Sequence, residues 1–181
     1  NSQSAGLVLT PGETIYIRLW NDGTNYMGTF NICVIENIPP PNDNPCGAIA
    51  LVAAPTCEPV SGTTESASPT PASFPGGTIT GATPGCAGPV NTDVWYYVDV
   101  PSDLTAPYGI AFQTLAGILL DGAFQLYTST GSCATSNLTL NPIGACTQGS
   151  PMPNLVLSVG GGGGQISPGQ RIYVRMWRQV A

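Results

Sequence analysis

A ten-residue segment that occurs twice constrains the fold of this 181-residue chain more than any other feature of its sequence. Residues 11–20 read PGETIYIRLW and residues 168–177 read PGQRIYVRMW, so Pro, Gly, Ile, Tyr, Arg and Trp recur at the same places. The two copies begin 157 residues apart, which is the size of one ordinary domain. We therefore expect the chain to begin inside one copy of a repeat and to end inside the next, as in a longer array or in a unit that a neighbour completes.

The first copy has the alternation of a half-buried β-strand. Within residues 14–20, Ile and Leu alternate with Tyr, Arg and Trp, which is the period of two that a strand requires. Asn-Asp-Gly at 21–23 supplies turn residues, and residues 28–35 (GTFNICVI) predict a second strand. Residues 1–37 are therefore predicted to be the C-terminal hairpin of a preceding repeat, or a donor segment.

A proline-rich stretch follows the predicted hairpin. Pro39, Pro40 and Pro41 favour stiff polyproline II and predict a linker over residues 38–45. Residues 46–181 hold short runs rich in β-branched and aromatic residues, separated by Gly, Pro, Asn or Ser. We predict an all-β fold for them, an antiparallel β-sandwich of immunoglobulin-like or jelly-roll-like type with disulfides, lacking its final strand. The predicted strands are 47–53, 92–100, 108–114, 122–128, 138–145, 154–159 and 170–177.

The missing residue types exclude several kinds of chemistry. The chain has no His and no Lys, and four Arg against ten Asp and Glu. A Ser-His-Asp or Cys-His nucleophile and a Schiff-base lysine are therefore excluded, and no acid pair stands out as a glycosidase pair. The net charge of −6 and the lack of a basic run argue against nucleic acid. No apolar run is long enough to span a bilayer. We expect no catalytic residue and no enzyme.

Six cysteines in a chain with few charges predict three disulfides and an oxidising compartment. Their wide spacing, without a CxxC pair, argues against a metal site. We expect Cys133 to pair with Cys146 around a strand-turn-strand, and Cys57 to pair with Cys86 at the base of a loop. Two arrangements stay open for the remaining pair: Cys33 bonds Cys46 within the chain, or Cys46 bonds Cys33 of the next copy. Residues 1–4 show no signal peptide, so export is expected to need an upstream signal.

Three groups of residues are candidates for binding or modification. An aromatic row can stack on sugar rings or pack in the sandwich; it comprises Tyr16, Trp20, Tyr173 and Trp177. The Ser/Thr/Pro-rich loop 61–83 is either a carrier of O-glycans or an ordinary ordered loop; its acceptors are Thr63, Thr64, Ser66, Ser68 and Thr70. Calcium is the single cofactor for which candidate ligands are present, although turn capping is the more usual role; these are Asp43, Asp93, Asp99, Asp103 and Asp121.

Several motifs occur in an order that resembles a known family: 42–49 (NDNPCGAI), 93–98 (DVWYYV), 126–128 (LYT) before 131–133 (GSC), the Cys146 strand, 11–20, and 28–33 (GTFNIC). Together they resemble the extracellular β-sandwich repeats of large secreted and cell-surface proteins of Bacteroidota-type bacteria, relatives of the pre-peptidase C-terminal domain. The resemblance implies a stalk, an adhesin body or an accessory domain. An acidic run often follows the hairpin cysteine in that family, and residues 147–150 (TQGS) replace it here, which puts a calcium site there in doubt.

These observations predict a structural subunit or repeat of an extracellular filament or adhesin that assembles head to tail with itself by strand complementation and disulfides. The expected location is extracellular, on the cell surface, without membrane insertion. The alternative is an accessory carbohydrate-binding module of a secreted enzyme, with glycans as partners. The residues expected to mediate assembly are Gly28, Thr29, Phe30, Asn31, Ile32 and Val34, with Pro39, Pro40 and Pro41 in the linker.

Overall fold

The structure is a computed structural model. It describes residues 12–20, 23, 28–86, 90, 92–105, 108–134, 137–159 and 166–179. The chain divides into two compact units, Asn1–Glu36 and Asn37–Ala181, and each is described by itself.

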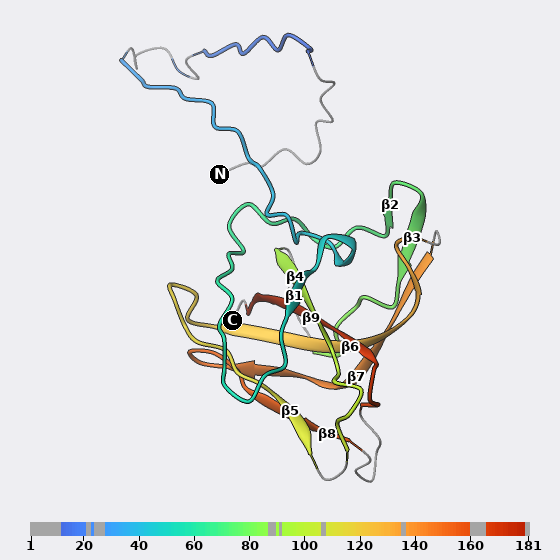
Figure 1. Cartoon of the computed structure of the whole chain (residues 1–181). Helices are drawn as coiled ribbons and strands as arrows, with labels where there is room; N and C mark the ends of the chain where they lie inside the picture. Colours follow the sequence, from blue (N-terminus) through green and yellow to red (C-terminus); the bar gives the residue numbers. More distant parts are fainter. Residues whose placement is uncertain are drawn as a thin grey trace. The chain divides into compact units, whose positions relative to one another are not determined.

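The second unit is built from strands, in the all-β fold with disulfides that the sequence predicts (Figure 1). Seven strands form one curled sheet in the order β1-β4-β9-β6-β7-β3-β2, and β5 pairs with β8 in a second sheet. A short 3-10 helix, Pro45–Gly47, precedes the first strand. The strands are β1 (Ile49–Leu51), β2 (Ser73–Phe74), β3 (Gly77–Thr80), β4 (Asp93–Asp99), β5 (Gly109–Phe112), β6 (Gly122–Ser132), β7 (Asn137–Gly149), β8 (Leu155–Ser158) and β9 (Arg171–Arg178).

The large sheet is mixed, whereas the sequence predicted antiparallel pairing. β1 runs parallel to β4, with Ile49 opposite Tyr96, and β3 runs parallel to β7. Parallel neighbours need a crossover connection of about a dozen residues or more, and the long segment between β1 and β4 provides one. That segment also contains β2 and β3, which lie inside the loop predicted over 61–83.

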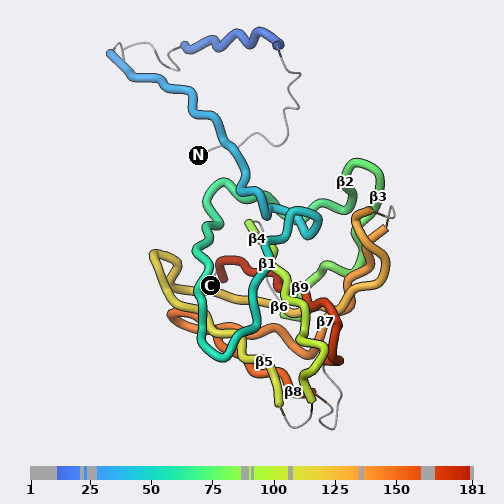
Figure 2. Tube along the Cα trace, viewed as in Figure 1, coloured from blue at the N-terminus to red at the C-terminus, as the bar shows by residue number. Residues whose placement is uncertain are grey.

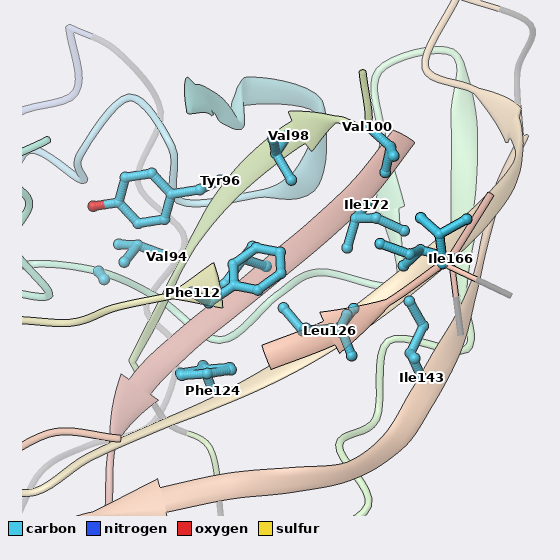
Figure 3. Close-up of a cluster of buried hydrophobic side chains, with 14 residues drawn as sticks. Val94, Tyr96, Val98, Val100, Phe112, Phe124, Leu126, Ile143, Ile166 and Ile172 are labelled. Atoms are coloured by element: carbon cyan, nitrogen blue, oxygen red, sulfur yellow. The ribbon is translucent and has the colours of Figure 1, made fainter. Parts of the chain in front are cut away.

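The main core lies between the large sheet and the β5–β8 pair (Figure 3). The central strands direct alternate side chains into it, among them Val94, Leu126 and Ile172, each at most 1% exposed. β5 and β8 cover it from the other side with Phe112 and Leu157. The full set of buried members is Ala67, Val94, Tyr96, Val98, Val100, Phe112, Phe124, Leu126, Ile143, Leu157, Val159, Ile166, Ile172 and Val174.

The opposite face of the central strands is buried as well. Trp95 and Tyr127 pack at a ring-centroid distance of 5.5 Å, and Tyr173 joins them with Ile79 and Leu138. The segment that carries β2 and β3 therefore covers this face. As a result, β4, β6 and β9 are inner strands with both sets of side chains enclosed.

The second half of the predicted linker 38–45 belongs to this unit. Asn42 is buried and donates from Nδ2 to the carbonyl of Trp95 at 3.0 Å, while the Trp95 N–H donates to the Asn42 carbonyl at 2.8 Å. Pro45 is buried too. Residues 42–45 thus line the edge of β4, so a linker can extend only over the residues before them.

The first unit, the blue part of the trace in Figure 2, shows no assigned strand among its described residues, so the hairpin predicted within 1–37 is not seen there. Its turn residues Asn21 and Asp22 lie outside the described residues. Every described residue from 12 to 36 is exposed. A lone two-stranded hairpin is marginally stable in water, which accounts for the difference. Among the residues described, none belongs to a helix with the length and apolarity needed to cross a membrane.

Candidate assembly surface

The two copies of the duplicated segment have opposite environments. In β9, Tyr173 and Trp177 are 7% and 3% exposed, whereas the matching Tyr16 and Trp20 are 92% and 75% exposed. The aliphatic positions differ in the same way, since Ile172 and Val174 of β9 are buried in the main core and the matching Ile15 and Ile17 are exposed. One sequence pattern therefore forms an inner strand in one copy, whereas the described residues of the other copy, 12–20, are exposed and have no assigned strand.

The exposure of each aromatic ring decides which of the sugar-stacking candidates can contact a sugar. Tyr173 and Trp177 were predicted to be able to stack on sugars, and this is wrong because both rings are enclosed within the sandwich. Tyr16 and Trp20 remain open to solvent. The exposed pair is the part of the aromatic row that can still meet a ligand or a second protein.

Residues 28–35 expose an alternating apolar face. Phe30, Ile32 and Val34 are each more than half exposed. The positions between them are Thr29, Asn31 and Cys33, also exposed. Such an alternation is suited to a strand with one buried face, yet no strand is assigned there. This segment therefore has the pattern of a strand that has no sheet among the described residues.

A buried ion pair lies on the second face of the large sheet. Arg175 donates from Nε and Nη2 to the two carboxylate oxygens of Asp93, each at 3.0 Å, and from Nη1 to the carbonyl of Ala82 at 2.7 Å. Trp95 Nε1 donates to the same carboxylate at 2.9 Å. Tyr127 donates from its hydroxyl to the Ala82 carbonyl at 2.7 Å. Since every nitrogen of the guanidinium is engaged, the network is structural.

The Ser/Thr-rich loop is bound to the sheet by two aspartates. The N–H and hydroxyl of Ser68 both donate to the carboxylate of Asp43, and those of Thr70 both donate to Asp93. Ser68 and Thr70 are partly buried and engaged in this way, which argues against these two residues as O-glycan acceptors. Thr63 is exposed, and Thr64 and Ser66 are partly buried. Glycosylation of these three stays a prediction.

The disulfides differ from the predicted pairs. Cys46 bonds Cys133 and Cys86 bonds Cys146, with Cα–Cα distances of 5.6 and 5.7 Å. The predicted Cys133–Cys146 bond is wrong because 137–149 is one strand, β7, which places Cys146 roughly 30 Å from the hairpin end at about 3.3 Å per residue.

The two other predicted disulfide pairs are wrong as well. Cys57 cannot pair with Cys86, nor Cys33 with Cys46, because Cys86 and Cys46 already have partners. Cys33 and Cys57 are free and exposed. The sandwich unit is thus crosslinked twice, and one thiol remains in each unit of the chain.

The calcium candidates have protein partners in most cases. Asp43 accepts from Ser68, Asp93 pairs with Arg175, and Asp99 pairs with Arg171 at 2.7 Å. Asp103 and Asp121 are exposed. Within the described ranges, no three acidic, Cys or His side chains group together as metal ligands.

Two pKa shifts follow from these contacts. Burial raises the pKa of Tyr127 to about 12. The hydrogen bond from Arg171 lowers the pKa of Asp99, with the positive charge of Arg171 acting in the same direction against partial burial. Both shifts reflect structural contacts.

The sequence predictions did not include the roles of Asp93, Arg175 and Thr70 as one network. The alternation within β4 and β9 could have suggested it, because Asp93 lies two residues from Trp95 and Arg175 lies between Tyr173 and Trp177. Polar residues among aromatic positions of one strand face predict a buried pair. Comparison of the chain with protein-family models, curated proteins and solved structures finds no match.

Proposed function

We propose that this chain is a structural subunit or repeat of an extracellular filament or adhesin, and that its copies join head to tail by strand complementation. The observation that carries the proposal is the contrast between the two copies of the duplicated segment. The copy in β9 is enclosed, and the copy at 12–20 is exposed together with residues 28–35.

The exposed segment has what β-augmentation requires. It is extended in pattern, it offers backbone groups, and Phe30, Ile32 and Val34 alternate as pocket-filling side chains. Contiguous exposed apolar side chains are typical of association sites. Because donor segment and recipient sheet are different surfaces, the contact is heterologous and can continue into a ring or an open filament.

The disulfides support the proposed location. Two bonded pairs, Cys46–Cys133 and Cys86–Cys146, fit an oxidising compartment. Outside the cell, they also favour the persistence of a structural protein, because they restrict the unfolded chain. An attachment to a cell surface is part of the proposal.

A second candidate function is carbohydrate binding as an accessory module. The exposed rings of Tyr16 and Trp20 favour it, since an aromatic row can stack on sugar rings. The first proposal also explains these rings, because the matching residues of β9, Tyr173 and Trp177, are buried. We therefore rank assembly first.

Imaging and a glycan array separate the two functions. Negative-stain images of the purified chain at increasing concentration should show rings or filaments whose repeat has the size of one sandwich. A Phe30→Asp variant should lose them, and a Thr29→Asp variant, changed on the opposite strand face, should keep most of them. Monomers at high concentration that bind a defined glycan through Tyr16 and Trp20 would favour the carbohydrate module.

A further inference from the structure

The β5–β8 sheet has an unpaired edge at β5 among the described residues. Ile110 lies opposite Leu157 and Phe112 opposite Leu155, and the Val159 N–H donates to the Tyr108 carbonyl at 3.0 Å. In an antiparallel pair, alternate residues direct both backbone groups to the partner, and those between them direct both groups away. Gly109 and Ala111 therefore present N–H and C=O groups on the outer edge of β5.

The other edges are less suited to receive a strand. Val159, directly after β8, already forms a bridge with Ile166, so that edge is partly occupied. The large sheet ends in β1 and β2, which are three and two residues long. At β5, the exposed side chains of Tyr108 and Leu115 extend the apolar surface beyond both ends of the strand.

The main core is incompletely covered at several places, one of them on β5. Ile110 packs against it only partly buried, as do Ile49, Leu51 and Ala53 from β1 and the residues after it. A strand added to the edge of β5 continues the face of Ile110 and Phe112. It can direct three alternating apolar side chains onto this surface, which is the number on one face of residues 28–35, namely Phe30, Ile32 and Val34.

Two free, exposed cysteines are available to such a contact. Cys33 belongs to the 28–35 segment, on the alternate positions from Phe30 and Ile32, and Cys57 lies four residues after Ala53. Four extended residues reach about 13 Å, so Cys57 lies within that distance of Ala53, which packs against the main core. The bonds from Cys46 and Cys86 leave these two thiols as the free cysteines of the chain.

We propose that residues 28–35 of one copy pair with the outer edge of β5 in a second copy, and that Cys33 of the donor then bonds to Cys57 of the recipient. The inference rests on the proposed function and names its contact. Two S–H bonds break and one S–S bond forms. The two electrons and the two protons pass to an external disulfide oxidant such as oxidised glutathione, whose S–S bond breaks to give two thiols.

A mixing experiment tests the bond. A Cys33→Ser chain labelled with ¹⁵N keeps Cys57, and an unlabelled Cys57→Ser chain keeps Cys33. With oxidised glutathione, the mixture should give a reducible dimer at least about fivefold more abundant than either variant alone, because docking raises the effective thiol concentration. Mass spectrometry should find a labelled Cys57 peptide bonded to an unlabelled Cys33 peptide. A Cys33–Cys57 bond found only within single wild-type chains would overturn the inference.

An edge variant tests the location separately. Ala111→Pro removes an outward N–H of β5, and Val156→Pro removes the corresponding outward N–H of β8. Self-association should weaken at least about tenfold for Ala111→Pro and stay within about twofold for Val156→Pro. Peptide mapping of both native disulfides checks that each variant folds. Assemblies that form normally with Ala111→Pro and with both thiols free would refute this inference and leave the proposed function standing, whereas a wild-type chain that never associates would refute both.

Discussion

Arg175 and Asp93 form a two-point ion pair inside the sandwich, with both nitrogen–oxygen distances at 3.0 Å and the Asp93 carboxylate fully enclosed. The pair joins β9 to β4 on the face that the Ser/Thr-rich loop covers. Removing one partner of a buried pair leaves the other charge without compensation, which costs more than the pair itself contributes.

Asp93→Asn should therefore lower the free energy of unfolding by about 3–5 kcal/mol. Asp99→Asn is the matched control, because Asp99 pairs with Arg171 between the same two strands but both side chains are about half exposed. It should cost less than about 1 kcal/mol. Urea unfolding of the two variants measures the difference, and equal losses would contradict a structural role for the buried pair.

Thr70→Val should destabilise the chain by about 1–2 kcal/mol, because it removes the hydroxyl that donates to Asp93 and accepts from Trp95 Nε1 at 2.7 Å. Thr63→Val, in the same loop, removes an exposed hydroxyl that accepts from the Glu65 N–H, and should change stability by less than about 0.5 kcal/mol. Thermal unfolding compares the two. If both variants melt together with the parent chain, the loop is not held as described.

The pH dependence of stability should carry the signature of Tyr127. Its pKa is raised from 10 to about 12 in the folded chain, so the folded state keeps its proton when the unfolded state has lost it. The stabilisation is complete below pH 10 and declines as pH rises through about 12.

Tyr127→Phe should remove that part of the alkaline decline, at the cost of the hydrogen bond to Ala82 at all pH values. Urea unfolding between about pH 9 and pH 11.5 measures it. Both proteins should carry Cys33→Ser and Cys57→Ser, since free thiolates exchange with disulfides. An alkaline decline of the same size in both would exclude Tyr127 as its source.

The two disulfides should not be interchangeable with the two free thiols. The Cys46–Cys133 bond closes a sequence separation of 87 residues. Replacing both of its cysteines by Ser should lower the free energy of unfolding by about 4–5 kcal/mol, if the bond acts by restricting the unfolded chain. Replacing Cys33 and Cys57 by Ser should leave the unfolding of dilute, monomeric chain unchanged. Denaturation at low protein concentration measures both double variants. A large loss of stability on replacing Cys33 and Cys57 would show that these two residues belong to the core of the monomer.

Local patterns predicted much of the fold. The runs at 92–100, 108–114, 154–159 and 170–177 became β4, β5, β8 and β9, because alternation and β-branched or aromatic content report on a strand whatever its neighbours are. The all-β class followed from the same runs.

The hydrogen-bond partners and the disulfide pairs could not be predicted, because they depend on contacts between distant residues. The sequence around Ser68 and Thr70 is typical of a solvated loop. Yet the two residues donate hydrogen bonds to Asp43 and Asp93, which lie 25 and 23 residues away. The cysteine pairs failed for the same reason, since the continuity of β7 past Gly144 decides where Cys146 lies. Local composition contains no information on either point.

Sedimentation velocity of the whole chain tests whether its copies join by strand complementation. The parent chain is compared with Ile32→Asp and, as the control on the opposite strand face, with Asn31→Asp. Strand complementation predicts oligomers that grow with concentration for the parent chain and for Asn31→Asp. It predicts monomers for Ile32→Asp, because a charge replaces a side chain that the contact buries. A parent chain that stays monomeric at every concentration, or an Ile32→Asp variant that assembles like the parent, would contradict it.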